Sequence, residues 1–566
     1  MKKIMTSRFW WIFLLIGLVA VNFLASVFHA RLDLTKEKRY TLSKATRGLL
    51  RSLEKPVRID IFLTGDLNAG FRKLANSTEE FVSLLKDRNS SKVQYRVMSP
   101  MEAIPGSSRL YRDTLEALGA VPINLTDQTE TGASSNIIYP VALVSYNDQQ
   151  ELVRLYTGNE RFVSQADIVN SEAAMEYEFA RVIDQLVSPR KPFVAYSIGN
   201  GEPMDARTYG IQEALDKDYR LALLNINSQP VNADTFDVLL MVKPSLQFTE
   251  SEKLKIDQYV MNGGKLLLFI DALIAEQDSL KMNAATIAYD RNLNLTDQLF
   301  KYGARINPSI VMDLQCDFMP FVVGGTPENP QREFLHWNYY PLFEPQANHS
   351  ITRGLGLVAG RFVNSIDTIA VEGVRKTVLL ASSANSRILS TPVRIDVNEN
   401  RNAPQDASFQ KKDIPVALLL EGTFTSNYRH RVSNAQRDSL TAMGVTFRDH
   451  SEENKMIIVG DGDMALNDVS PTNGPLPLGV NIYTLRSPYQ YQFANRAFLL
   501  NCLEYLVSKP AISETRNKNI VLRLLDSKKV KENKRSWQLI NIALPILLVV
   551  LAGIIYQYIR KRKYAE

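Results

Sequence analysis

Two long apolar segments near the ends of the chain constrain its fold more than any other feature. The first covers residues 9–28 (FWWIFLLIGLVAVNFLASVF), and the second covers residues 537–558 (WQLINIALPILLVVLAGIIYQY). Each has about 20 nearly uncharged residues, which at ~1.5 Å per residue is enough to cross a ~30 Å hydrocarbon core. The sequence therefore predicts two transmembrane helices, with residues 29–536 between them on one side of the membrane.

Basic residues outside the two segments indicate the orientation. Lysine and arginine residues lie at 2–8 and at 560–563, and such residues favour the cytoplasmic side. Basic residues at 31–39 and 528–535 point the other way, but long loops cross a membrane largely regardless of charge. We expect an uncleaved N-terminal anchor, both termini in the cytoplasm, and a large periplasmic domain held at the cytoplasmic (inner) membrane by two spans.

The composition is that of a folded protein. Hydrophobic residues make up 45% and charged residues 22% of the 566 positions, and a body of this size suggests about two to four domains. The net charge of +6 comes with basic residues near the spans, which favours contact with membrane lipid and not with nucleic acid. Only Cys316 and Cys502 are present, so no disulfide framework is expected, and whether they pair stays open.

Alternating strand and helix patterns between residues 29 and 188 predict a thioredoxin-like α/β module. A helix capped by Thr41 or Ser43 begins this module. Its other expected elements are a strand at 57–65, a helix at 70–88, a strand at 93–100, a helix at 108–118, a hairpin at 139–158 and a helix at 170–187. The loop after the first strand lacks cysteine, so redox chemistry of the C-x-x-C kind is not expected.

The next part of the chain, residues 189–508, predicts a larger α/β domain with a flavodoxin-like parallel sheet. Its apolar strands are separated by amphipathic helices, a pattern typical of a parallel sheet covered on both faces. The sequence TESE begins a helix at Thr249 with a capping box. A β-rich insertion is expected at about 310–450, and the sheet resumes with KMIIVGDGD at 455–463.

The complete predicted organisation has seven parts. They are a cytoplasmic tail (1–8), a first span (9–28), the thioredoxin-like module (29–188), the larger α/β domain with its insertion (189–508), a basic membrane-proximal stalk (509–536), a second span (537–558) and a cytoplasmic tail (559–566).

Several segments together resemble a family of transporter components. They are RYTLSKATRGLLRSLEKPVRIDIFLTG, the GNGE turn, the block DVLLMVKP through QYVMNGGKLLLFID, and GDGDMALND with NRAFLLNCLEYL. Over nearly its whole length the chain resembles the auxiliary component of gliding-motility ABC transporters, in particular the GldG type. The resemblance implies an extracytoplasmic body, an ABC-2-type permease and a cytoplasmic ABC ATPase as partners, and no assigned catalytic residues. The larger α/β unit also resembles the amidotransferase-like domains of intraflagellar-transport proteins.

The chain lacks the motifs of two enzyme classes. A P-loop needs G-x-x-x-x-G-K-[ST], and the sequence GGKLLL has neither the spacing nor the hydroxyl. An active amidotransferase needs a cysteine on a tight turn after a strand, but Asp271 follows KLLLFI. We therefore expect no enzymatic activity and no cofactor.

Two segments are candidate ligand sites. Gly199, Asn200, Gly201 and Glu202 form a turn between a strand and a helix, where glycines can expose backbone N–H groups at the edge of the sheet. The alternative is that these glycines only make a tight turn. The aromatic cluster His336, Trp337, Tyr339 and Tyr340 can stack on a sugar or dock a partner, and its alternative is packing in the core.

Polar residues elsewhere suggest weaker sites. Asp461, Asp463 and Asp468 could hold a hard cation, but their spacing matches no known calcium loop, and a solvated loop is the alternative. No metal is therefore expected. In the spans, Asn22, Asn541 and Pro545 suggest surfaces that assemble with neighbouring helices, although Asn541 also fits a position near the interface.

These observations predict a non-catalytic, membrane-anchored auxiliary subunit of an ABC-2-type transporter complex involved in gliding motility. The subunit would couple the permease and ATPase to an extracytoplasmic partner or cargo. The alternative is an extracytoplasmic module that captures a peptide, glycan or lipid for the permease.

Overall fold

The computed structural model describes most of the chain after residue 40. Before that point only Ile16 and Val19 are described, so the predicted first span (9–28), with Asn22, lies otherwise outside the described residues. The described ranges are 41–129, 132–156, 165–187, 190–282, 285–326, 329–346, 349–353, 355–397, 406–507 and 527–564. The chain forms two compact units, Met1–Lys518 and Asn519–Glu566, and each is described by itself.

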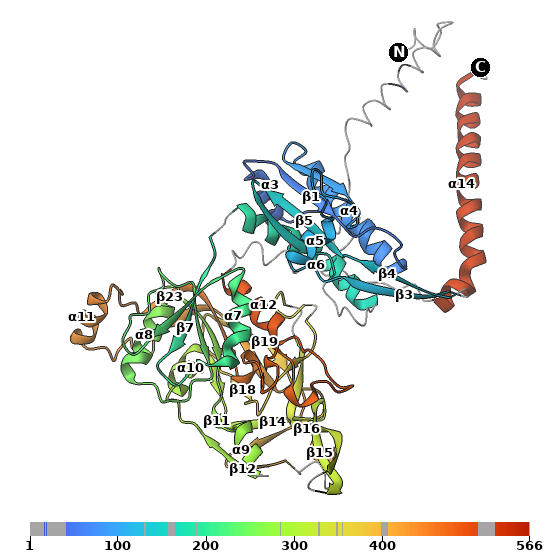
Figure 1. Ribbon diagram of the computed structural model, residues 1–566. Coiled ribbons are helices and arrows are strands. Elements are labelled where there is room, and N and C mark those ends of the chain that lie inside the picture. The colour runs from blue at the N-terminus through green and yellow to red at the C-terminus, as the bar shows by residue number, and fades with distance from the viewer. Residues whose placement is uncertain are drawn as a thin grey trace. The chain divides into compact units, whose positions relative to one another are not determined.

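A four-stranded mixed sheet lies at the centre of the N-terminal part of the first unit (Figure 1). Its strand order is β2-β1-β5-β6, with β1 parallel to β2 and antiparallel to β5. The elements are α3 (Lys44–Arg51), β1 (Val57–Ile61), α4 (Ala69–Arg88), β2 (Val93–Val97), α5 (Tyr111–Ala117), β3 (Ile123–Thr129), β4 (Gly132–Ile138), β5 (Val141–Tyr146), β6 (Gln149–Arg154) and α6 (Gln165–Val187). The predicted order of strands and helices is present, and an unpredicted hairpin, β3–β4, stands between α5 and β5.

Local sequence explains the helices that cover this small sheet. Ser43 caps α3, since its Oγ accepts a hydrogen bond from the Thr46 N–H at 3.0 Å, so the second of the two predicted caps is used. In α4 the residues Phe71, Leu74 and Leu85 recur at helical spacing and are buried together with apolar residues of α6. These two helices pack against the apolar face of the sheet.

A larger sheet follows in the same unit. Its main strand order is β15-β16-β19-β22-β23-β10-β9-β7-β8, with β17 paired to β16. These strands are β7 (Phe193–Ile198), β8 (Arg220–Asn225), β9 (Val238–Val242), β10 (Lys265–Phe269), β15 (Cys316–Thr326), β16 (Asn329–Pro345), β17 (Val358–Ala359), β19 (Val374–Ala381), β22 (Pro415–Thr425) and β23 (His450–Val459). Five of them, β23, β10, β9, β7 and β8, run parallel.

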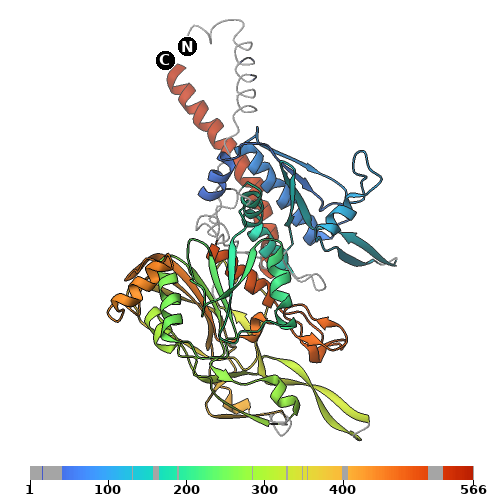
Figure 2. The same cartoon turned by 60° about the vertical axis from the view of Figure 1, so that its left-hand side comes forward.

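The wholly parallel sheet that the sequence predicts is therefore extended. β22 pairs antiparallel with the parallel strand β23, and β19 pairs antiparallel with β22. Both come from the region predicted as a β-rich insertion. Strands of this region complete the main sheet because the hydrogen-bonding edge of β23 would otherwise be left unpaired. Figure 2 shows that the β15–β16 hairpin, from the same region, extends away from the body of the domain.

Helices cover both faces of the large sheet, as predicted. Apolar residues of α7 (Tyr209–Asp216) and α12 (Asn495–Val507) share one core with the strands, and those of α8 (Glu250–Met261) and α10 (Thr296–Tyr302) share another (Figures 1 and 2). The predicted capping box begins α8: Thr249 Oγ1 accepts from the Glu252 N–H, and Glu252 accepts from the Thr249 N–H.

Smaller elements complete the large domain. They are α9 (Gln277–Met282), α11 (Asn434–Ala442), β11 (Leu273–Ile274), β12 (Ala285–Asp290), β13 (Ala304–Ile306), β14 (Ser309–Asp313), β18 (Ile366–Thr368), β20 (Ser386–Ser390), β21 (Val393–Asp396), β24 (Val469–Ser470), β25 (Gly474–Pro475), and the 3₁₀ turns η1 (Ala206–Thr208), η3 (Asp406–Ser408), η4 (Asp463–Ala465) and η5 (Ile482–Thr484).

In its described residues the second unit is one long helix, α14 (Ser527–Tyr564). Its segment Trp537–Arg562 has a mean hydropathy of 2.6 and is the one helix in the described part of the chain that is long and apolar enough to cross a membrane. This segment contains the predicted second span, together with Asn541 and Pro545, which are both exposed on the helix.

Candidate functional site at the carboxyl edge of the parallel strands

The five parallel strands of the large sheet end at a common edge. The GNGE turn follows β7, Lys243 follows β9, Asp271 lies two residues beyond β10, and Asp461 lies two residues beyond β23. Ligands of open α/β sheets bind beyond the carboxyl ends of the strands. This edge is therefore the first place to look for chemistry.

The GNGE turn is built around its two glycines. Gly199 and Gly201 have φ values of +118° and +76°, which side chains rarely allow. A Cβ on Gly199 would lie 2.8 Å from the Asn225 Oδ1, and a Cβ on Gly201 would collide with the Ser245 Oγ. Both positions require glycine for the backbone path alone.

Most polar groups of this turn bind each other or a neighbouring helix, although the buried Asn200 Oδ1 has no hydrogen-bond partner among the described residues. The Glu202 carboxylate accepts hydrogen bonds from the Ser197 Oγ at 3.0 Å and from the Asn200 N–H at 2.8 Å. The Asn200 amide in turn donates a hydrogen bond, at 3.1 Å, to Glu252, which belongs to the capping box of α8. Glu202 is buried, and burial raises its pKa above the ordinary value. This geometry agrees with the structural alternative for the turn, and ligand binding there stays a prediction.

Lys243 is the central residue of the edge, and sequence reasoning did not single it out. Its Nζ lies 2.8 Å from Asp463, 3.1 Å from Glu276 and 3.4 Å from Asp271. The side chain is 6% exposed, and the residue has a φ of +48°. Burial lowers the pKa of the ammonium, but the three carboxylates outweigh burial and hold this pKa above its ordinary value.

The carboxylates around Lys243 are held by further contacts. Asp461 is fully buried and accepts from the Asp463 N–H at 2.7 Å and the Arg361 N–H at 2.8 Å. Asp271 accepts from the Gly462 N–H at 2.5 Å. Burial raises the pKa of Asp461 and Asp271. The loop that carries the predicted aspartates is thus tied to the neighbouring strands from within.

Asp468, the third of the predicted aspartates, forms a bidentate pair. Both of its oxygens accept from the Arg361 guanidinium, at 2.7 and 2.6 Å. Asp468 also accepts from the Ile482 N–H at 2.9 Å. Asp461, Asp463 and Asp468 therefore each hold a protein partner, and no group of three acidic, histidine or cysteine side chains in the described residues is arranged to hold a metal ion.

The predicted aromatic cluster lies on β16. Trp337, Tyr339 and Tyr340 are buried and surround Phe362, with ring centroids 5.8, 6.2 and 6.0 Å from it. His336 is exposed, and its Nδ1 lies 2.8 Å from the Cys316 carbonyl oxygen. Three of the four side chains thus pack in the core, which agrees with the alternative interpretation. Stacking on a ligand stays a prediction.

The cavity beside these groups is small. It has a volume of 30 Å³ and is lined by residues that include Tyr340, Arg361, Asp463 and Asp468. A space of ~30 Å³ holds about one water molecule. The Tyr340 hydroxyl has no hydrogen-bond partner among the described residues, so a single water is a fitting occupant.

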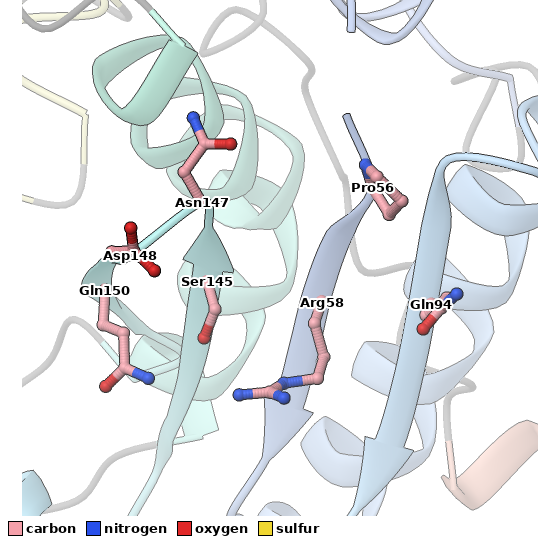
Figure 3. Close-up of a pocket in the computed structure, with 7 residues that line it drawn as sticks. All are labelled: Pro56, Arg58, Gln94, Ser145, Asn147, Asp148 and Gln150. Atoms are coloured by element: carbon pink, nitrogen blue, oxygen red, sulfur yellow. The ribbon is translucent and has the colours of Figure 1, made fainter. Parts of the chain in front are cut away.

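A larger depression of 410 Å³ lies on the small sheet instead (Figure 3). Its lining is mostly polar and comes from all four strands of the small sheet, from the residue before β1 and from the turn between β5 and β6, namely Pro56, Arg58, Gln94, Ser145, Asn147, Asp148 and Gln150. Sequence reasoning missed this site because its residues are scattered over separate strands and form no motif in the sequence. Only the pairing of the strands brings these side chains together.

The two cysteines are free and buried. Burial raises the pKa of both thiols, so neither is prepared to act as a thiolate nucleophile. The two cysteines lie in different elements, Cys316 at the start of β15 and Cys502 in α12.

The fold and the edge thus define a mixed α/β protein in which the carboxyl edge of the parallel strands is filled by paired charges. The chain belongs to the family described as an ABC-type uncharacterized transport system, whose model matches residues 191–502. A second model, described as a domain of unknown function (DUF7088), matches residues 36–145. The first match covers the large sheet, and the second covers most of the small one. The chain is therefore a component associated with ABC-type transport.

Individual relatives are distant. An uncharacterized protein of Borreliella burgdorferi (strain ATCC 35210 / DSM 4680 / CIP 102532 / B31) is 20% identical over 453 residues, which cover 77% of this chain and 81% of that protein. Among solved structures, the mmIFT52 N-terminal domain is 11% identical with a TM-score of 0.31, covering 56% of this chain and 98% of that chain. The exo-beta-1,4-mannosidase Op5Man5 from Opitutaceae bacterium strain TAV5 is 9% identical with a TM-score of 0.20, covering 76% and 51%.

Proposed function

We propose that this protein is a non-catalytic, membrane-anchored auxiliary subunit of an ABC-2-type transporter complex of the GldG type, acting in gliding motility. The observation that carries the proposal is the family match over residues 191–502, followed in the same chain by the apolar helix α14. A transport component that carries its own apolar helix is suited to remain beside a permease. In this proposal the permease and a cytoplasmic ATPase supply transport and ATP hydrolysis.

The charge network around Lys243 supports a role without catalysis. In α/β enzymes the carboxyl edge holds reactive groups that face a substrate. Here Lys243 contacts three carboxylates of the protein, and Arg361 is bound to Asp468. These charges stabilise the loops of the domain and leave a cavity about the size of one water.

The proposal includes the domain organisation that the sequence predicts. Residues 29–188 form the thioredoxin-like module, residues 189–508 form the amidotransferase-like domain, and both lie in the periplasm between spans at 9–28 and 537–558. The basic residues of the stalk at 509–536 contact lipid headgroups. The body couples movements of the permease to an extracytoplasmic partner or cargo.

Purification of the full chain from native membranes tests this proposal. We expect an ABC-2-type permease and an ABC ATPase to co-purify and to be identified by mass spectrometry. If neither co-purifies from membranes in which both are present, the proposal is wrong.

Variants of α14 test whether the span is an assembly surface. Asn541→Leu removes a side-chain amide from the exposed surface of the helix. Hydrogen bonds between membrane helices contribute about 0.6–2 kcal/mol, so the yield of co-purified permease should fall by about three- to thirtyfold. Val549→Leu, an apolar change at another exposed position of the helix, is the control and should leave the yield unchanged. Equal yields from the two variants would show that the Asn541 amide contributes nothing to assembly.

The second candidate function is capture of a peptide, glycan or lipid for the permease. At the carboxyl edge this function needs more space than the 30 Å³ cavity offers. A bound ligand that co-purifies with the complex would favour it.

A further inference from the structure

The depression on the small sheet contains a straight row of polar side chains. Strand register places Gln94 beside Arg58, Arg58 beside Ser145, and Ser145 beside Gln150. One residue from each of the four strands thus lies in the same row and on the same face. At ~4.8 Å between strands, the row is about 14 Å long.

The two faces of this sheet differ sharply. The residues on either side of the row in sequence, such as Ile59 on β1 and Val144 on β5, point to the opposite face and are buried with α4 and α6. On the face of the row, the apolar residues Phe62 and Leu143 pack with the short helix α5. Figure 3 shows Arg58, Ser145 and Gln150 on the face that points away from the helices behind the sheet. The row therefore lies in a polar depression beside the part of this face that α5 covers.

Arg58 is held in position while most of its guanidinium stays available. Its Nε lies 3.3 Å from the Asp60 carboxylate, which is buried and also binds Arg96 at 2.5 Å. The Arg58 side chain is 49% exposed. Asp60 thus orients two arginines, and Figure 3 shows the Arg58 guanidinium turned from β1 towards the strand that carries Ser145.

Ser145 supplies an independent observation. The residue is 7% exposed, lines the depression, and its hydroxyl has no hydrogen-bond partner among the described residues. A buried polar group without a partner destabilises the folded protein, so such groups in native proteins call for an explanation. A ligand in the depression would supply the missing partner.

We propose that this depression binds a polyhydroxylated chain, that is, a glycan. Arg58 offers donors, the amides of Gln94 and Gln150 offer donors and acceptors, and Asp148 offers acceptors. Sugar hydroxyls both donate and accept, so they satisfy this mixture. An anion such as phosphate would be repelled by the negative charge of the Asp148 carboxylate, whereas a neutral sugar would not. An extended peptide would pair with the edge of a sheet and not across its strands. The volume of 410 Å³ is in the range of small-molecule sites.

The site extends the proposed function and does not depend on it. A periplasmic subunit with a glycan site would contact cell-surface polysaccharide while the transporter acts, but binding can be measured without any transporter subunit. Loss of glycan binding would leave co-purification of the permease intact, so the two proposals fail separately.

The experiment uses the full chain in lipid nanodiscs, since detergents with sugar headgroups would compete for the site. Binding is screened on an array of bacterial surface polysaccharides and of neutral oligosaccharides such as maltohexaose, cellohexaose and chitohexaose. The best soluble binder is then titrated by calorimetry. Arg58→Ala should lower its affinity by about ten- to a hundredfold, because hydrogen bonds to charged groups contribute about 1.5–3 kcal/mol.

Two adjacent glutamines provide a matched pair. Gln150→Ala removes a member of the row and should weaken binding, whereas Gln149→Ala changes an exposed glutamine on the opposite face and should not. Ser145→Ala should weaken binding without lowering the melting temperature, because it deletes a hydroxyl that has no partner in the protein.

The outcomes separate the possibilities. Absence of binding to every glycan on the array overturns the proposal. Binding that is equally weakened by Gln149→Ala and Gln150→Ala also overturns it, as does binding that inorganic phosphate abolishes at equal concentration. Binding lost in Arg58→Ala and Gln150→Ala, with unchanged melting temperature, supports it.

Discussion

The replacement Lys243→Met tests the charge network at the carboxyl edge. Methionine keeps much of the length of the side chain but removes the charge that Asp463, Glu276 and Asp271 share. Removing one partner of a buried ion pair costs about 3–5 kcal/mol, because the remaining charge is left uncompensated. The three carboxylate side chains are 20%, 34% and 11% exposed, so water relieves part of this cost. We expect a loss near the lower limit, about 3 kcal/mol.

Thermal unfolding of the full chain measures this loss. Tryptophan fluorescence reports on the large domain, since Trp337 is buried in one of its cores. With a shift of about 2–4 °C per kcal/mol, a loss of about 3 kcal/mol lowers the melting temperature by about 6–12 °C. Lys217→Met is the control: Lys217 is 54% exposed and forms a single pair with Glu151, so its loss should cost less than about 1 kcal/mol. Equal shifts for the two variants would refute the central role of Lys243.

The pH dependence of the same variant provides a second test. Burial raises the pKa of Asp271 in the folded state, and the Lys243 charge opposes this rise. Between its unfolded and folded pKa values the folded state binds more protons, so the stability contribution of this group falls as pH rises through that window. Without Lys243 the folded pKa rises further, and the window extends upward. The difference in melting temperature between wild type and variant should therefore be larger at pH 8 than at pH 5, and an unchanged difference would contradict this account.

Three further predictions concern the turn, the thiols and the orientation. Gly201→Ala should lower the free energy of unfolding by about 1–3 kcal/mol and by more than Gly263→Ala, because both glycines have positive φ but only Gly201 lacks space for a Cβ; chemical denaturation compares them. Cys316 and Cys502 should react with a thiol reagent at pH 8 only after unfolding, since burial raises the pKa of both, and rapid labelling of the native protein would contradict this. A cysteine introduced at the exposed Leu246 should be labelled by a membrane-impermeant reagent on intact spheroplasts, whereas labelling only after lysis would place the body in the cytoplasm.

The sequence by itself determined the local elements. The capping box at Thr249 and Glu252, the cap at Ser43 and the apolar helix at 537–558 were all predicted, because each depends on residues a few positions apart. The buried parallel strands were predicted for the same reason, since their continuous apolar runs report burial on both faces.

Only the tertiary structure decided which strands pair. β23 lies beside β10, with Met456 opposite Leu266, although the two are far apart in sequence, and β22 then adds an antiparallel partner. No local pattern encodes such a contact, because pairing depends on the whole set of edges that must be filled.

The dependence on strand pairing also explains why the site at the carboxyl edge was predicted only in part and the depression on the small sheet was not predicted. The GDGD loop and the GNGE turn were visible as motifs, but Lys243, which joins three carboxylates, stands alone in its segment. The row of Gln94, Arg58, Ser145 and Gln150 has one residue on each strand, so only strand register assembles it. Short-range periodicity fixes which face a side chain occupies, and long-range pairing fixes which side chains share that face.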